Sequence, residues 1–188
     1  MERARNYSLW MEQGYILFAE EGLEGIQIER LARILQLNKS GFYHYFADLE
    51  GYYEDLIKLH KQKIDRFVHD VGEAKTLDPD YLFVLIKHAP TVMFQVQLTR
   101  IKDRVSFYET SKAVDQRVNV AVHNLWGDYL DVHGNSDLAL RYFHLVRDMF
   151  YTRISFKNLN YEFLHNLAAE AKLLVNQLGQ YKSQVGAQ

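Results

Sequence analysis

The sequence contains no cysteine among its 188 residues and only two prolines. Without cysteine, disulfide frameworks, thiolate zinc sites and cysteine nucleophiles are all excluded, and the chain is compatible with a reducing compartment. The longest uninterrupted apolar run is Tyr81–Ile86, whereas roughly 20 apolar residues are needed to span a bilayer. Because no apolar signal region opens the sequence either, we expect a cytoplasmic protein without a membrane partner.

The sequence also lacks an excess of positive charge. Its formal net charge is −2, and residues 1–46 contain five basic and six acidic side chains. A surface for duplex DNA would therefore have to be local, because no general basic field exists. Apolar residues make up 48% of the chain, which is sufficient for a core and excludes disordered and collagen-like classes.

Helical periodicity runs through nearly the whole sequence, and no alternating strand pattern persists. In the first helix, apolar or small residues recur at i, i+4, i+7 and i+8 as Trp10, Gly14, Leu17 and Phe18, and Gly22 is expected to end that helix. The fold class is therefore predicted to be all-α. Further helices are expected over about 27–35, 38–46, 48–71, 109–132, 137–156 and 160–178.

A helix start is predicted at the segment LDPDYLF. Asp78 is expected to cap the helix, Pro79 to occupy its first position, and Asp80 to interact with its dipole. Pro90 is expected to kink or end the same helix. The distribution of helix lengths predicts two domains, a small one over residues 1–46 and a larger helical one over residues 47–188.

The segment LARILQLNKSGFYHYF, Leu31–Phe46, gathers polar and aromatic side chains into a short helix. A helix-turn-helix needs two short helices with apolar inner faces, so that the second can enter a groove. Asn38 is a good N-cap for that second helix. The inner faces would consist of Ile28, Leu31, Ala32, Leu37, Phe42 and Phe46, and the outer face of Lys39, Ser40, Gly41, Tyr43 and His44. The alternative is an ordinary capped amphipathic helix with a polar face.

The stretch LFAEEGLEGIQIERLARILQLNKSGFYHYFADLEGYYEDLI, Leu17–Ile57, resembles the TetR family of bacterial transcriptional repressors. The likeness covers about the first third of the chain, and its strongest parts are LFAEEG and YHYF. It implies a three-helix helix-turn-helix domain on a larger helical body, which binds a small molecule and forms a homodimer. The implied function is a sequence-specific regulator, expected to be a repressor released from a palindromic operator by an unidentified small-molecule effector.

The resemblance also implies a role for individual residues. Lys39 would contact the DNA backbone or a guanine edge, Tyr43 and His44 would meet phosphate or base, and Gly41 allows close approach of the backbone. The recognition helix would be positioned by Gln27, Asn38 and Ser40.

Several positions depart from the family pattern, and each departure weakens an expected contact. Gln36 occupies the turn position where the family usually has glycine, so it is expected to adopt a left-handed conformation. Ile26 and Gln27 replace a Thr-Thr pair that caps the first short helix. Leu49 replaces a lysine commonly found at the start of the following helix. DNA binding is therefore expected to use few ionic contacts.

Two further sets of residues are predicted for the body. A continuous apolar stripe with small residues at its centre is typical of closely packed helices, in a dimer interface or in an intramolecular core. Its members, with those of the preceding helix, are Leu145, Met149, Leu164, Leu167, Ala168, Ala171, Leu174, Val175 and Leu178. An apolar ligand pocket, or equally an ordinary core, would be formed by Phe83, Met93, Phe94, Phe107, Tyr108, His123 and Trp126.

Enzymatic function is not expected, and no cofactor or metal is predicted. The pair Glu162 and His165 has the spacing used in di-iron bundles, but a second such pair is missing. His69 and Glu73 supply only two ligands. The alternative to a DNA-binding regulator is a helical ligand- or partner-binding protein with little remaining DNA affinity.

Overall fold

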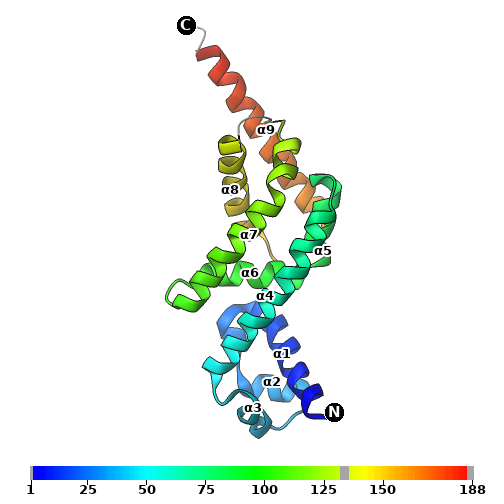
Figure 1. Ribbon diagram of the computed structural model, residues 1–188, viewed down its shortest axis with the longest axis vertical. Coiled ribbons are helices and arrows are strands. Elements are labelled where there is room, and N and C mark those ends of the chain that lie inside the picture. The colour runs from blue at the N-terminus through cyan, green and yellow to red at the C-terminus, as the bar shows by residue number, and fades with distance from the viewer. Residues whose placement is uncertain (1, 132–135, 186–188) are drawn as a thin grey trace. The chain divides into compact units, whose positions relative to one another are not determined.

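The computed structural model describes the backbone of residues 2–131 and 136–185, and the side chains of residues 3–131 and 141–177. In this part of the chain the fold is all-α, with nine α-helices, two short helical segments of other types and no strand (Figure 1). The all-helical fold class is therefore confirmed. The elements are α1 (Glu2–Glu21), the 3₁₀-helix η1 (Gly22–Gly25), α2 (Ile28–Leu35), α3 (Lys39–Phe46), α4 (Leu49–Glu73), the π-helix η2 (Leu77–Tyr81), α5 (Leu82–Lys87), α6 (Ala89–Arg100), α7 (Val105–Tyr129), α8 (Ser136–Arg153) and α9 (Tyr161–Val185).

Local sequence signals account for several helix boundaries. Helix α1 ends before Gly22, which has φ +70°, a conformation that glycine adopts at little cost. The break expected near Pro90 is present, because His88 leaves the helical region with φ −102° and ψ 27°, and Pro90 lies in the first turn of α6. Helix α7 begins at Val105, earlier than expected.

A helix begins in the segment LDPDYLF as predicted, but the expected cap by the Asp78 side chain is wrong. Asp78 has extended dihedral angles of φ −119° and ψ 117° and lies inside η2, and the N-cap is Thr76. The Thr76 side chain accepts from the backbone N–H of Asp80, whose carboxylate in turn accepts from the backbone N–H groups of Lys75 and Thr76 at 3.0 Å each. The Asp78 carboxylate instead binds side chains of α9, a long-range contact that local capping rules do not include.

The helices gather into two compact units. The first unit consists of Met1–Phe67 and His88–Asp115, and the second of Val68–Lys87 and Gln116–Gln188. The predicted division of the chain between residues 46 and 47 remains a prediction.

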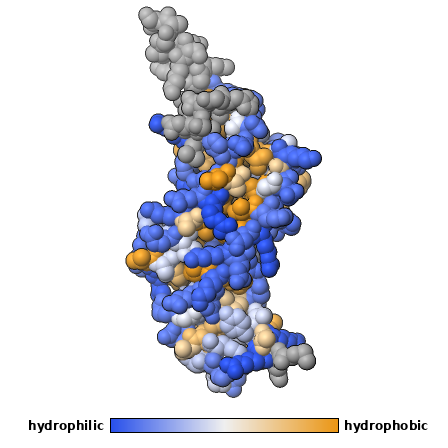
Figure 2. All heavy atoms as spheres, viewed as in Figure 1, coloured by the Kyte–Doolittle hydropathy of each residue, from blue (hydrophilic) through white to orange (hydrophobic). Residues whose placement is uncertain are grey.

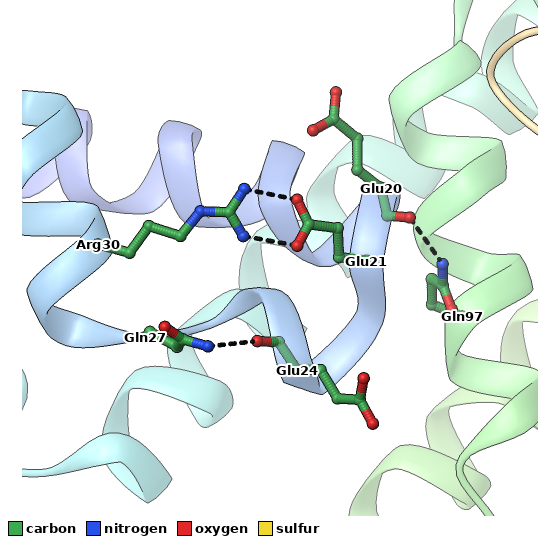
Figure 3. A network of polar contacts seen from close by, with 6 residues as sticks. All are labelled: Glu20, Glu21, Glu24, Gln27, Arg30 and Gln97. Atoms are coloured by element: carbon green, nitrogen blue, oxygen red, sulfur yellow. Dashed lines mark hydrogen bonds and ion pairs between the residues drawn. The ribbon is translucent and has the colours of Figure 1, made fainter.

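The core of the first unit is formed by α1 packed against α6. The Tyr15 ring stacks on Phe94 with 4.3 Å between ring centroids, and Phe18 contacts the same ring at 4.2 Å. Such aromatic pairs contribute to stability beyond the apolar area that they bury. The amide of Gln97 donates to the backbone carbonyl of Glu20 at 3.3 Å, so α6 also satisfies an acceptor at the end of α1 (Figure 3).

A chain of buried polar groups crosses the same core. The Tyr15 hydroxyl lies 2.7 Å from His60 Nδ1, and His60 Nε2 lies 3.1 Å from Gln95 Oε1. The Gln95 amide nitrogen donates to Ser111 O and to Asp115 Oδ1, so its oxygen must face the imidazole. His60 therefore carries its proton on Nε2, and Nδ1 accepts from Tyr15. Burial lowers the pKa of His60 to about 4, which keeps the ring neutral near pH 7.

In the second unit, α9 packs against α5 and α8. The rings of Trp126 and Phe143 meet edge to face with centroids 5.8 Å apart, joining α7 to α8. Phe83 of α5 stacks on Tyr161 of α9 at 5.2 Å. Aromatic contacts in the second unit therefore join consecutive helices, α7 and α8, as well as helices distant in sequence, α5 and α9.

Candidate nucleic-acid interface

Helices α2 and α3 are joined by a tight connection that local interactions define. Ile28, Leu31 and Ala32 are buried on the inner face of α2, as predicted. Gln36 follows with φ 55° and ψ 36°, so the left-handed conformation expected at this position is confirmed. The backbone N–H of Leu37 donates to the Ala32 carbonyl at 3.0 Å, which satisfies one of the last carbonyls of α2.

The N-terminus of α3 is fixed by Asn38. Its side-chain oxygen accepts from the backbone N–H of Ser40 at 3.1 Å, which confirms the expected N-cap. Phe42 and Phe46 are 0% and 4% exposed and anchor the inner face of α3. The Phe42 ring meets Trp10 of α1 and Tyr52 of α4 edge to face, at 5.4 Å and 5.0 Å. These contacts prevent α3 from rotating about its axis.

The outer face of α3 carries the residues predicted to meet DNA. Their side chains are exposed, Tyr43 by 48%, and a Cβ added to Gly41 would meet no atom within 4 Å. The exposed residues are Lys39, Ser40, Tyr43 and His44. The chain thus presents one cation, two hydroxyl groups and an imidazole beside the first turn of a helix, whose backbone N–H groups favour negative charge.

Gln27 precedes α2 as its N-cap residue, but its side chain makes no capping hydrogen bond. The Gln27 amide instead donates backward to the carbonyl of Glu24 at 3.3 Å, as Figure 3 shows. The weakened cap expected from the replacement of threonine is therefore present. Gln27 is exposed and lies at the start of α2.

Two basic side chains of this surface are paired with carboxylates. Arg30 donates two hydrogen bonds, of 2.5 Å and 2.6 Å, to the two carboxylate oxygens of Glu21 (Figure 3). Lys39 of α3 donates to the carboxylate of Glu29 on α2. The hydrogen bond from Lys39 holds the pKa of the Glu29 carboxyl below its usual value, and the same bond raises the pKa of Lys39. Both groups therefore remain charged at neutral pH.

Sequence reasoning did not identify Glu21 or Glu29 as members of this surface. Glu29 and Lys39 are ten residues apart and lie on different helices, so the spacing rule for pairs within one helix does not find them. The sequence did carry one signal for Glu29, its position on the outer face of α2, because Ile28 and Leu31 occupy the buried face.

The predicted pocket residues are divided between the two units. Met93, Phe94 and Phe107 are buried in the first unit, where Tyr108 is 38% exposed. In the second unit Phe83 is 55% exposed, His123 is half-buried and Trp126 is buried. The indole N–H of Trp126 has no hydrogen-bond partner in the described part of the chain. A ligand pocket at these residues remains a prediction.

The predicted dimer-interface residues have unequal exposure within one chain. Leu174 and Leu145 are 43% and 52% exposed, Met149 is half-buried, and Leu178 lies outside the described side chains. Leu173, which the prediction omitted, is 59% exposed. The remaining residues are buried within the chain: Leu164, Leu167, Ala168, Ala171 and Val175. The stripe therefore contributes to the intramolecular core, and its use between two chains remains a prediction.

In the second unit, His165 of the spaced pair Glu162 and His165 belongs to a polar cluster with Asp78 and Tyr161. His165 Nδ1 lies 2.6 Å from Asp78 Oδ2, and the Tyr161 hydroxyl donates to Asp78 Oδ1 at 2.7 Å. Glu162, the residue paired with His165 by spacing, is exposed and does not contribute to this cluster. The carboxylate partner of His165 is therefore Asp78.

The described residues contain no group of three or more His, Cys, Asp or Glu side chains placed to hold a metal ion. Over the same residues, no helix combines the length and the apolar character that a membrane crossing requires. In comparisons with known proteins, no family model, no curated protein and no solved structure matches this chain.

Proposed function

We propose that this protein is a sequence-specific DNA-binding transcriptional regulator of the TetR type, in which α2 and α3 act as a helix-turn-helix. The observation that carries the proposal is the two-sided character of α3. Phe42 and Phe46 fix its inner face in the core, whereas Lys39, Tyr43 and His44 stand on its outer face. In this role α3 enters the major groove of duplex DNA.

The N-terminal turn of α3 suits contact with phosphates and base edges. Asn38 satisfies one N–H of the first turn, that of Ser40, and so fixes the direction of the helix start. The Lys39 ammonium and the Ser40 hydroxyl can donate to phosphate oxygens, and Lys39 can also donate to a guanine edge. Gly41 has open space around its Cα, which permits close approach of the DNA backbone.

A homodimer follows from the size of the reading surface, because one recognition helix reads too few base pairs alone. Two copies related by a twofold axis would recognise a palindromic operator. Leu145 on α8 and the pair Leu173 and Leu174 on α9 are exposed apolar side chains that a partner chain would cover. Hydrophobic residues are visible among hydrophilic ones on the face drawn in Figure 2.

Regulation by a small molecule belongs to the same proposal. The buried indole N–H of Trp126 offers a donor that an acceptor atom of an effector would satisfy. An effector that prefers a conformation unable to match two half-sites lowers operator affinity by its differential affinity for the two states. In this scheme the protein is a repressor that its effector releases from DNA.

The second candidate is a helical partner- or ligand-binding protein with little DNA affinity. The specific observation in its favour is the pairing of Arg30 with Glu21 and of Lys39 with Glu29, which neutralises two cations of the α2–α3 surface. A protein that binds DNA mainly through phosphates loses affinity with each cation that is neutralised.

Selection of duplexes from a random DNA pool at low salt separates the two candidates. Wild-type protein is expected to enrich a palindromic motif. The double variant Lys39→Ala, Tyr43→Ala should enrich nothing, with unchanged helix content and association state. The control is Lys61→Ala, which removes an exposed lysine outside α2 and α3. If the folded wild-type protein enriches no motif, the second candidate replaces the first.

A further inference from the structure

The ion pair between Glu29 and Lys39 joins the outer faces of α2 and α3. Lys39 is the only lysine or arginine in α3, and its ammonium donates to the Glu29 carboxylate. Both side chains remain accessible to solvent, with Lys39 exposed by 47% and Glu29 by 70%. The pair therefore occupies the surface on which a DNA phosphate would approach Lys39.

Carboxylate and phosphate are both oxygen anions that accept from an ammonium group. A lysine that contacts a phosphate must therefore exchange Glu29 for the phosphate or share its three donors between two anions. Opening an exposed ion pair costs little free energy. The pair therefore lowers the affinity of Lys39 for a phosphate only modestly. The freed Glu29 carboxylate would also stand close to the DNA and repel its backbone.

We infer that Glu29 is an internal competitor of DNA, which withholds Lys39 from phosphates until the ion pair opens. This inference rests on the proposed DNA-binding function. In the first turn of α2, Glu29 also interacts favourably with the helix dipole. Glu29 thereby contributes to the stability of α2, while its charge lowers the affinity of the surface for any duplex.

The competition has a consequence for salt dependence. A lysine that neutralises a phosphate releases a counterion from DNA and adds about 0.9 to the slope of log affinity against log salt concentration. In the wild-type protein the nearby Glu29 carboxylate offsets part of the positive charge of Lys39, so this contribution is reduced. Removal of the Glu29 charge should restore it.

The test compares four variants on one mixed-sequence duplex at low salt, because phosphate contacts do not depend on sequence. Glu29→Gln is expected to bind about two- to fivefold more tightly than wild type, with a salt slope steeper by up to about 0.9. Glu24→Gln is the matched control, because Glu24 is a neighbouring exposed carboxylate without a lysine or arginine partner in the described residues. The affinity gained by Glu24→Gln should be smaller than that gained by Glu29→Gln.

The variant Lys39→Ala completes a double-mutant cycle with Glu29→Gln. In the Lys39→Ala background, Glu29→Gln should gain no more than Glu24→Gln gains in wild type, because no lysine remains to be freed. Urea unfolding of each variant establishes that affinity is compared between folded proteins.

Four outcomes would overturn the inference. Equal gains for Glu29→Gln and Glu24→Gln, or a gain that persists without Lys39, would reduce Glu29 to one acidic charge among others while leaving the DNA-binding function intact. Weaker binding by folded Glu29→Gln would assign the pair to holding α2 and α3 in a binding arrangement. Absence of binding by the folded wild type and by every variant would remove the proposed function together with the inference.

Discussion

Gly14 of α1 provides the space that the side chain of Tyr52 occupies. A Cβ added to Gly14 would lie 1.6 Å from the Tyr52 hydroxyl oxygen and 2.7 Å from the ring carbon that carries it. The hydroxyl group donates to the Trp10 carbonyl at 2.7 Å, and Tyr52 is fully buried. A single missing side chain on α1 therefore decides how α4 packs in the first unit.

Replacement of Gly14 by alanine is expected to destabilise the protein by about 2–4 kcal/mol, because Tyr52 must move and lose its hydrogen bond. The matched control is Gly127→Ala, since a Cβ at this helical position meets nothing within 4 Å. The control should gain about 0.5–1 kcal/mol from helix propensity. Urea unfolding measures both. Adding Tyr52→Leu, which removes the clashing atoms, should make the Gly14→Ala substitution much less costly; equal costs in both backgrounds would disprove the packing explanation.

The neutral state of His60 predicts a pH dependence of stability. Its pKa is lowered to about 4 in the folded protein, against about 6.5 in an unfolded chain. Between these values the unfolded chain binds the proton and the folded protein does not, so stability falls as the pH drops from about 6.5 to about 4. The total loss from His60 is on the order of 3 kcal/mol.

Denaturant unfolding at several pH values checks this dependence on wild type and on His60→Leu. The variant starts from a lower stability, because Tyr15 and Gln95 lose a partner, but its stability should change less over the same pH window. The control His44→Gln removes an exposed histidine and should retain the wild-type slope. A wild-type slope in the His60 variant would show that other groups cause the acid sensitivity.

Asn38 is expected to stabilise α3 through its capping hydrogen bond to Ser40. Asn38→Ala should lower the free energy of unfolding by about 1 kcal/mol, whereas Asn38→Asp keeps an acceptor at the cap and should cost little. Thermal and urea unfolding followed by circular dichroism measure the difference. If alanine and aspartate have equal effects, the side-chain oxygen of Asn38 contributes nothing to the helix start.

The exposed leucines of α9 provide a test of the proposed homodimer. Leu173→Glu with Leu174→Glu should yield a folded monomer at concentrations where wild type is dimeric, because the two charges would have to be buried at the interface. Gln116→Glu with Asn124→Glu adds the same charges at exposed polar positions of α7 and should preserve the dimer. Analytical ultracentrifugation distinguishes these outcomes. A leucine variant that remains dimeric places the interface elsewhere.

Features that depend on neighbouring residues could be predicted from the sequence. The end of α1 at Gly22 and the cap at Asn38 each follow from interactions within a few residues. The left-handed Gln36 was expected from the family resemblance, because the family usually has glycine at this turn position. The two faces of α3 could be predicted for the same reason, because helical periodicity separates Phe42 and Phe46 from the polar residues.

Features that depend on residues distant in the sequence could not be predicted. Sequence periodicity placed Gly14 in the buried stripe of α1 but could not show that Tyr52 fills the space beside it. Asp78 has the sequence features of an N-cap, yet its carboxylate binds Tyr161 and His165. The ion pair of Lys39 with Glu29 could not be predicted for the same reason, because the two side chains meet only when α2 and α3 are folded together.

Helix α6 differs from an ordinary amphipathic helix, because every residue from Thr91 to Leu98 is buried. Most helices keep a solvent-facing side on which substitutions accumulate with little effect. This segment has no such side, so two full turns of the chain lack a neutral position. In a library of all single substitutions, Thr91–Leu98 should therefore stand out as an unbroken block of intolerance, without the periodic tolerance that marks other helices. An insertion of one residue here would rotate the following part of the helix by about 100° and would misplace Gln95 and Gln97 together.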